Sequence, residues 1–444
     1  MKLAIQSVVF TIFVTVTVSA DSLPLRFFSP DDAVGGSGVT VLAMTPEPGD
    51  TLLARDESRP KLWFAPVAAL PVDGSVRIWY QRVNAGENDF SDQRTLCVGE
   101  IRAGVWSPLE IDPGPPAWGG VNNVCMRRSP HKPTWGGFNV FQIVRDQSQY
   151  RMLYWDQPAD GEAGAMLASS SDGLTWTKDP RGAVFTEHND AYTLVQKDGE
   201  YLLYQTALED WPDKPYPDNL DKYRRVISLR RSPDLAQWSP QQVFLRPDGG
   251  DAPETEFYLF KVFAYSGKYL GHLMKYYGDP DKPKQHSAIL KHELLVSDDA
   301  VVWQRPFRDT DLGFWSYADP FPLNDALHFA IWKDGGMVTV KFPHGRLTGV
   351  HADDEGVFTT RPFPMPRKGL LLDADTANGW LVAQPVDAGG EPIRNLHPIR
   401  IEGRNAADIP LQWRVNRLHS LVQRDTRLKI LLHKATLYAV RAVE

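Results

Sequence analysis

The chain has 444 residues, with 48 Lys and Arg against 55 Asp and Glu, so its formal net charge is −7. Hydrophobic residues make up 42% and charged residues 23%, a balance that excludes a disordered or collagen-like chain. The mildly acidic charge, without a basic block, argues against nucleic acid or an anionic membrane surface as a partner. The 14 Trp, 34 Gly and 35 Pro favour many short strands joined by turns.

The first twenty residues have the pattern of a secretory signal peptide. Lys2 precedes a mostly apolar run over residues 3–18, and two small residues follow at 19–20. We predict cleavage after Ala20 and therefore a secreted or periplasmic protein; an uncleaved membrane anchor is the alternative. No later window holds the roughly 18 apolar residues that a membrane span needs. Residues 21–49 are interpreted as an N-terminal extension.

A repeated turn that ends in tryptophan divides the next part of the chain into similar units. The turns are residues 171–176, 232–238 and 297–303, with a shorter version ending at Trp106. Each follows an alternating strand rich in aromatic residues, and a fifth such strand covers 327–332. Period-2 alternation bounded by turns is typical of antiparallel strands, and a unit of about 60–70 residues with four strands is one propeller blade. We predict an all-β fold with a five-bladed β-propeller over residues 50–345, in which the tryptophan turns are structural.

Composition changes after residue 345. The proline-rich segment 361–366 is typical of a stiff connector. Short alternating stretches follow it. We predict a C-terminal β-sandwich over residues 361–444 that supports the propeller; sugar binding is the alternative role.

The innermost strand of each blade lines the channel of a propeller, so acids on these strands are candidate functional groups. The inner strands should precede the aromatic middle strands, at residues 63–70, 136–144, 188–195, 254–264 and 315–323. Three of them carry an acid in an otherwise apolar or aromatic run, namely Asp190, Glu256 and Asp319. Blade one offers Asp56 or Glu57 just before its strand, and blade two offers only Asn139.

Several carboxylates near one axis would have pKa values pushed apart, which separates a general acid from a base. Cleavage of a glycosidic bond needs such a pair. The predicted catalytic residues are Glu256 as general acid, Asp190 as base or nucleophile, and Asp319 as a group that tunes a pKa or holds the substrate. The alternative for each acid is a hydrogen-bond partner that closes a blade or caps backbone amides.

Neighbouring residues have side chains that can bind sugar. Aromatic rings can stack on sugar rings, although most are expected in the core. His188 should share a face with Asp190 and could orient it, bind a hydroxyl, ligate an ion or serve only a structural role. A basic pair could bind a uronate or sulfate group, or form a solvated loop face. The candidate substrate-binding residues are His188, Asn189, Tyr258, Trp315, Tyr317, Arg224 and Arg225.

Other chemistries lack their motifs. The sequence has no Gly-x-Ser-x-Gly elbow, P-loop, His-Glu-x-x-His helix or Gly-rich nucleotide fingerprint. Cys97 and Cys125 lack metal-ligand spacing; they could form a disulfide or remain buried thiols. We expect no cofactor and no metal in the site, although a structural cation such as calcium could occupy the channel. The expected partner is a carbohydrate, with no nucleic acid and no membrane after signal-peptide cleavage.

Five stretches resemble a known family, at residues 76–80, 150–155, 169–176, 255–258 and 434–439. In them the chain is similar to secreted proteins, common in planctomycetes and related bacteria, that resemble glycoside hydrolase families 32 and 43. The resemblance implies a five-bladed propeller, in many relatives with a C-terminal β-sandwich. Our leading prediction is a secreted glycoside hydrolase that acts on plant or algal poly- or oligosaccharides. The better-known propeller hydrolases take their acids from blades one to three, whereas here the inner-strand acids lie in blades three to five. The alternatives are a non-catalytic glycan-binding propeller and, less favoured, an enzyme that cleaves acidic glycans by elimination.

Overall fold

The computed structural model describes residues 23–84, 93–111, 122–129, 138–146, 148–186, 191–216, 218–278, 288–413 and 424–443. The predicted signal peptide lies outside these residues. Apart from the three-residue 3₁₀ helix η1 (Pro30–Asp32), the regular structure of the described chain is all β, as predicted. None of the described helical structure has the length and apolarity that a membrane crossing requires.

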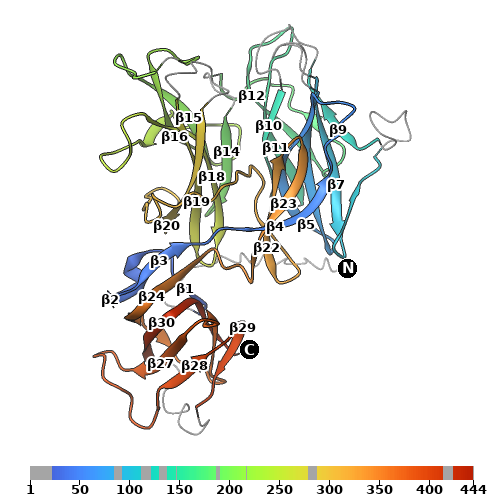
Figure 1. Cartoon of the computed structure of the whole chain (residues 1–444). Helices are drawn as coiled ribbons and strands as arrows, with labels where there is room; N and C mark the ends of the chain where they lie inside the picture. The colour runs from blue at the N-terminus through green and yellow to red at the C-terminus, as the bar shows by residue number, and fades with distance from the viewer. Residues whose placement is uncertain are drawn as a thin grey trace, which may run out of the picture.

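Five antiparallel sheets form the blades, which lie above a separate C-terminal sheet in Figure 1. Blade one consists of β5 (Leu62–Val72), β6 (Ser75–Asn84), β7 (Gln93–Arg102), β8 (Val105–Pro108) and β9 (Val124–Arg127). Blade two consists of β10 (Phe138–Asp146), β11 (Gln149–Asp156), β12 (Gly164–Ser170) and β13 (Thr177–Lys178). Blade three consists of β14 (Tyr192–Lys197), β15 (Glu200–Asp210), β16 (Tyr223–Ser232) and β17 (Gln242–Leu245). Blade four consists of β18 (Thr255–Tyr265), β19 (Lys268–Tyr277) and β20 (Ile289–Ser297). Blade five consists of β21 (Phe321–Leu323), β22 (Ala326–Lys333), β23 (Gly336–Pro343) and β4 (Glu47–Leu53). This arrangement confirms the predicted five-bladed propeller.

The fifth blade is closed by a strand from the start of the chain. β4 pairs antiparallel with β23, with Leu53 opposite Met337 and Glu47 opposite Lys341. The outer strand of this blade therefore comes from a segment far away in sequence. This explains why the aromatic strand at 327–332 has no tryptophan turn after it.

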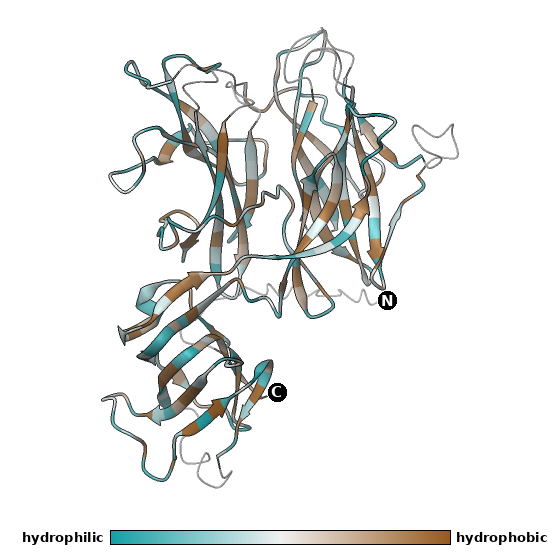
Figure 2. Cartoon of the chain, in the orientation of Figure 1, coloured by the Kyte–Doolittle hydropathy of each residue, from teal (hydrophilic) through white to brown (hydrophobic). Residues whose placement is uncertain are grey.

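Five apolar clusters join each blade to the next. Four of them lie between consecutive blades, from blades one and two to blades four and five. The fifth cluster contains Ala330 of blade five and Ile78 of blade one. First strands of neighbouring blades also contact one another, β5 with β10 and β21, β10 with β14, and β14 with β18, which places them around the axis. Figure 2 shows apolar residues along the strands and hydrophilic residues in many connecting loops. Packing between blades thus closes the ring and leaves the first strands as its inner wall.

The repeated tryptophan turns have the local structure expected of turns. One carboxylate oxygen of Asp172 accepts hydrogen bonds from the backbone N–H groups of Leu174 and Thr175, each at 2.8 Å. Asp234 and Asp299 bond in the same way to the residues two and three positions after them. A preceding serine hydroxyl donates to each aspartate. These acids are therefore committed to the turns.

The C-terminal part forms one hydrogen-bonded sheet of ten strands. Its long strand β30 (Asp425–Ala442) pairs with five others. The remaining strands are β24 (Thr348–Thr360), β25 (Phe363–Pro364), β26 (Leu370–Asp375), β27 (Trp380–Val386), β28 (Ile399–Glu402) and β29 (Asn405–Leu411), together with β1 (Leu25–Arg26), β2 (Ala33–Ser37) and β3 (Thr40–Ala43) from residues 23–43. The sheet has its own apolar core. Its organisation as a two-layer sandwich stays a prediction, because hydrogen bonds link all ten strands through β24, β26, β27 and β30.

Candidate active site

Side chains from three blades meet on the axis of the ring. Nζ of Lys261, on β18, lies 2.9 Å from Oδ1 of Asp319 and donates to Oε1 of Gln142, on β10, at 2.8 Å. Nε2 of Gln142 in turn donates to Oδ2 of Asp319 at 2.6 Å. Asp319 precedes β21 in blade five, so blades two, four and five are joined. Because blade two adjoins neither of the others, these contacts can form only across the axis.

Local backbone features aim these side chains at one another. The pairing of β10 with β11 shifts register between Val140 and Gln142, and such a bulge redirects the side chains around it. The hydroxyl of Ser316 donates to the carbonyls of Ala318 and Ala330, at 3.0 and 2.9 Å. These bonds fix the segment that carries Asp319 against β22.

Asp319 is the open member of this axial group. Lys261 and Gln142 are buried, each with 1% of its surface exposed, whereas 30% of the Asp319 side chain is exposed. Ion pairing with Lys261 fits a negatively charged carboxylate, and the two hydrogen-bonding partners fix its orientation. The axis thus presents an oriented carboxylate at the end of the propeller where the inner strands begin.

Glu256 has a different environment. It is 0% exposed, and its Oε2 accepts hydrogen bonds from the backbone N–H of Arg225 at 2.7 Å and from Nη1 of Arg225 at 3.0 Å. Its Oε1 lies 3.0 Å from Nζ of Lys214 and accepts a hydrogen bond from the hydroxyl of Tyr216. A fully buried carboxylate whose two oxygens are occupied by Lys214, Tyr216 and Arg225 is closed to a substrate. This geometry does not fit the general acid predicted from the sequence.

Asp218 completes the ionic network around Glu256. It pairs with the same two cations, Lys214 and Arg225, each at 2.9 Å. Burial opposes a charge on Asp218, but hydrogen bonds from these cations outweigh it and hold the pKa of Asp218 below its ordinary value. Burial also raises the pKa of Tyr276, which contacts Arg225, to about 12. At neutral pH Asp218 is therefore ionised and Tyr276 is neutral.

The predicted anion-binding pair, Arg224 and Arg225, is largely engaged within the protein. The Arg225 side chain is buried between Asp218 and Glu256. The guanidinium of Arg224 donates to the carbonyl of Thr255 at 2.7 and 2.9 Å and lies over the ring of Trp211. The sequence showed the adjacent arginines, but not the more distant partners that occupy them.

Of the other predicted residues, three aromatic ones lie within the described part of the chain. Trp315 and Tyr317 are half-buried on the segment that leads to Asp319, with ring centroids 5.5 Å apart. Tyr258 is half-buried at a register shift in β18, three residues before Lys261. Residues 187–190 lie outside the described residues, so the predictions for His188, Asn189 and Asp190 stay predictions.

Three further residues near this group, Lys261, Gln142 and Trp332, were not predicted from the sequence. Lys261 and Gln142 each interrupt an apolar inner strand, which is the signal that could have identified them. Trp332 is 53% exposed, and its ring contacts that of Trp63 edge to face at a centroid distance of 6.2 Å. Trp332 lies near the end of β22 and Trp63 near the start of β5, so both are at the same end of the propeller as Asp319. Alternation along 327–332 places Trp332 on the same face as Ala330, toward blade one.

No group of three or more His, Cys, Asp or Glu side chains among the described residues is arranged to hold a metal ion. On the described part of the axis, a positive charge is supplied by Lys261. Cys97 and Cys125 are free thiols on the paired strands β7 and β9, and burial raises the pKa of both.

Comparison with known proteins gives structural likenesses only. No family model matches the sequence, and no curated protein matches it. A solved structure described as a glycoside hydrolase is 12% identical, with a TM-score of 0.46 over 69% of this chain and 94% of that one. The BT0996 protein, solved in complex with RGII, is 14% identical, with a TM-score of 0.45 over the same shares. The family 32 β-fructofuranosidase BmSUC1 of Bombyx mori is 11% identical, with a TM-score of 0.43 over 89% of this chain and 94% of that one. These scores are too low to transfer an activity.

We expect Glu256→Gln to act mainly on stability. The substitution leaves Lys214 and Arg225 with one carboxylate fewer in a buried network, and breaking a buried ion pair costs about 3–5 kcal/mol. Chemical denaturation should show a loss of unfolding free energy in that range. Glu254→Gln, at a half-buried position two residues earlier, is the matched control and should cost less than about 1 kcal/mol. Equal stability of the two variants would show that the network does not support the fold.

Two buried histidines make stability depend on pH. His272 on β19 and His292 on β20 have ring centroids 5.7 Å apart, and Trp315 packs against both. Burial lowers the pKa of His272 well below 6.5, and the neighbouring His292 adds to this effect. Burial also lowers the pKa of His292, although Asp311, 3.5 Å away, opposes the shift. Below pH 6.5 the unfolded chain therefore takes up protons that the folded chain does not.

The thermal midpoint should consequently fall as the pH is lowered from 6.5 to 5.5, with no contribution from this pair above 6.5. His272→Phe removes one of the two groups and should reduce the slope. The exposed His397 offers a control, because His397→Gln should leave the wild-type slope in place. A slope that His272→Phe does not change would contradict this assignment.

Proposed function

We propose that the chain is a secreted glycoside hydrolase that cleaves glycosidic bonds in plant or algal poly- or oligosaccharides at the propeller mouth around Asp319. The observation that carries the proposal is the axial group itself. Asp319 is partly exposed and is held by Lys261 and Gln142 from two other blades. The sequence resemblance to secreted relatives of glycoside hydrolase families 32 and 43 supports the same class of reaction.

Glycosidic cleavage requires one ionised carboxylate and one protonated carboxyl group. Ion pairing with Lys261 suits Asp319 to the ionised role, in which it activates water or attacks the sugar directly. This role differs from the one predicted for Asp319 from the sequence, which was to tune a pKa or hold the substrate. The geometry of Glu256 leaves the proton donor to another residue. For this role we propose Asp190, which the sequence analysis assigned as base or nucleophile and which precedes β14 by two positions in the sequence. The described inner strands of all blades begin at the end of the ring where Asp319 lies.

Aromatic side chains near this mouth support a sugar as the substrate. Trp315 and Tyr317 precede Asp319, and the pair formed by Trp63 and Trp332 lies between blades five and one. Exposed aromatic faces bind the C–H faces of sugar rings while the hydroxyl groups remain free for polar partners. We assign substrate binding to these rings and bond cleavage to the carboxylates.

Asp319→Asn should lower kcat/KM for released sugar by at least about 100-fold, because an amide can neither accept the proton of water nor attack the sugar. The assay is product release from a panel of plant and algal glycans, with folding checked by thermal melt. Asp198→Asn is the matched control, since Asp198 lies in an inner-to-middle strand turn with φ 49°, which Asn tolerates. Full activity in folded Asp319→Asn would exclude this carboxylate from catalysis.

A non-catalytic glycan-binding propeller is the second candidate. The observation that favours it is the enclosed Glu256, which removes one of the predicted catalytic acids. Under this alternative the wild type binds glycans in calorimetry and releases no product from any of them.

A further inference from the structure

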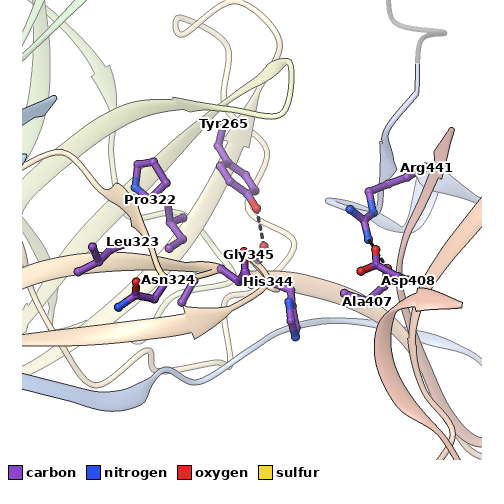
Figure 3. Close-up of a pocket in the computed structure, with 12 residues that line it drawn as sticks. Tyr265, Pro322, Leu323, Asn324, His344, Gly345, Ala407, Asp408 and Arg441 are labelled. Carbon is purple, nitrogen blue, oxygen red and sulfur yellow. Dashed lines mark hydrogen bonds and ion pairs between the residues drawn. The ribbon is translucent and has the colours of Figure 1, made fainter. Parts of the chain in front are cut away.

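A pocket lies at the end of the propeller opposite Asp319, where the propeller meets the C-terminal sheet. It is a pocket of about 550 Å³, shown in Figure 3. The turn between β21 and β22 and the turn after β23 form its propeller side, and Ala407, Asp408 and Arg441 form the opposite wall. Ligand sites commonly have volumes of about 300–1,000 Å³ and often lie between domains. The size and position of this pocket are those of a binding site.

Hydrogen bonds and ion pairs hold the walls in place. The hydroxyl of Tyr265 donates to the carbonyl of Gly345, which also accepts from Nη1 of Arg26 at 3.1 Å. On the opposite wall, Nη2 of Arg441 donates to Oδ1 of Asp408 at 2.6 Å. Close by, the buried side chain of Arg346 donates to Asp373 at 2.7 Å and so joins the propeller to the sheet. The pocket is therefore formed before a ligand arrives.

The lining combines polar groups with small apolar surfaces. Asn324, Asp325 and His344 line the pocket and are exposed, and all three have positive φ, in tight turns. Figure 3 shows the amide of Asn324 directed away from the wall that carries Asp408 and Arg441. Pro322 and Leu323 supply apolar surface beside them. The residues that line the pocket thus include an exposed carboxylate and an exposed imidazole beside apolar surface.

The charge of the pocket limits the class of ligand. Arg441 neutralises Asp408, and the negative charge of Asp325 is balanced by Arg26, which lies beside Gly345, so the pocket has no net positive charge to attract an anion. A purely apolar ligand would remove these polar groups from water without replacing their hydrogen bonds. A neutral saccharide has hydroxyl groups for the polar side chains and C–H faces for Pro322 and Leu323. We propose that this pocket binds a neutral oligosaccharide or one segment of a neutral polysaccharide.

The position of the pocket separates this role from bond cleavage. Asn324 and Asp325 follow β21, whereas Asp319 precedes it, so the two sites lie at opposite ends of the inner strand. Binding at the pocket consequently does not require hydrolysis. It would hold a glycan at a second point on the molecule.

The test is isothermal titration of the Asp319→Asn protein, which should not consume its ligand. The probes are cellohexaose, xylohexaose and mannohexaose, with a pectic hexagalacturonate as the anionic comparison. Asn324→Gly combined with Asp325→Gly removes both side chains, and glycine accepts the positive φ of the turn without strain. We expect at least one neutral probe to bind and the double substitution to raise its Kd at this site at least tenfold.

Asp73→Gly provides the matched control. Asp73 and Gly74 form the corresponding two-residue turn of blade one, also with positive φ, and lie outside the pocket. This variant should bind as the parent does. Binding of no neutral probe, binding of the hexagalacturonate alone, or an unchanged Kd in the double variant would each overturn the proposal. An inactive wild type that keeps pocket binding would instead count against the hydrolase proposal alone.

Discussion

The arrangement of the site depends on the contacts that the buried ammonium group of Lys261 makes with Asp319 and Gln142. A buried charge is costly unless partners satisfy it, and here the partners come from blade five, as Asp319, and from blade two, as Gln142. Blade two adjoins neither of the other two blades, so the three groups meet only when the ring is closed. Closure requires β4 from the start of the chain on the fifth blade and an apolar cluster between every pair of neighbouring blades. The whole propeller thus positions one carboxylate.

Two kinds of acid are present at this end of the molecule. Glu256 and Glu293 are completely buried and paired with arginine and lysine, Glu293 with Arg305 at 2.7 Å and Lys275 at 3.1 Å. Such enclosed ion pairs hold strands together and are closed to a substrate. Asp319 is also paired, but part of it faces outward. Exposure, rather than charge or position on an inner strand, is what separates the candidate for chemistry from the acids that serve the fold.

Much of the fold could be predicted from local pattern. Alternation and the repeated tryptophan turns indicated the five middle strands and most of the inner ones, because each strand buries one face against a neighbouring blade. The pairing of β4 with β23, and of residues 25–43 with the C-terminal sheet, has no local signal, since it joins distant segments. For the site, an acid in an aromatic run identified Asp319. The same pattern also selected Glu256, whose burial against Arg225 involves a contact between separate strands that the sequence does not reveal.

The most direct test of this account is a double-mutant cycle between Lys261 and Asp319, measured as the free energy of unfolding. Lys261→Met and Asp319→Asn remove the two charges separately and together. The account predicts that the double variant is less destabilised than the sum of the single variants by about 1–3 kcal/mol, the coupling expected of groups in direct contact. Additivity to within about 0.5 kcal/mol would contradict it, because the two side chains would then not meet on the axis.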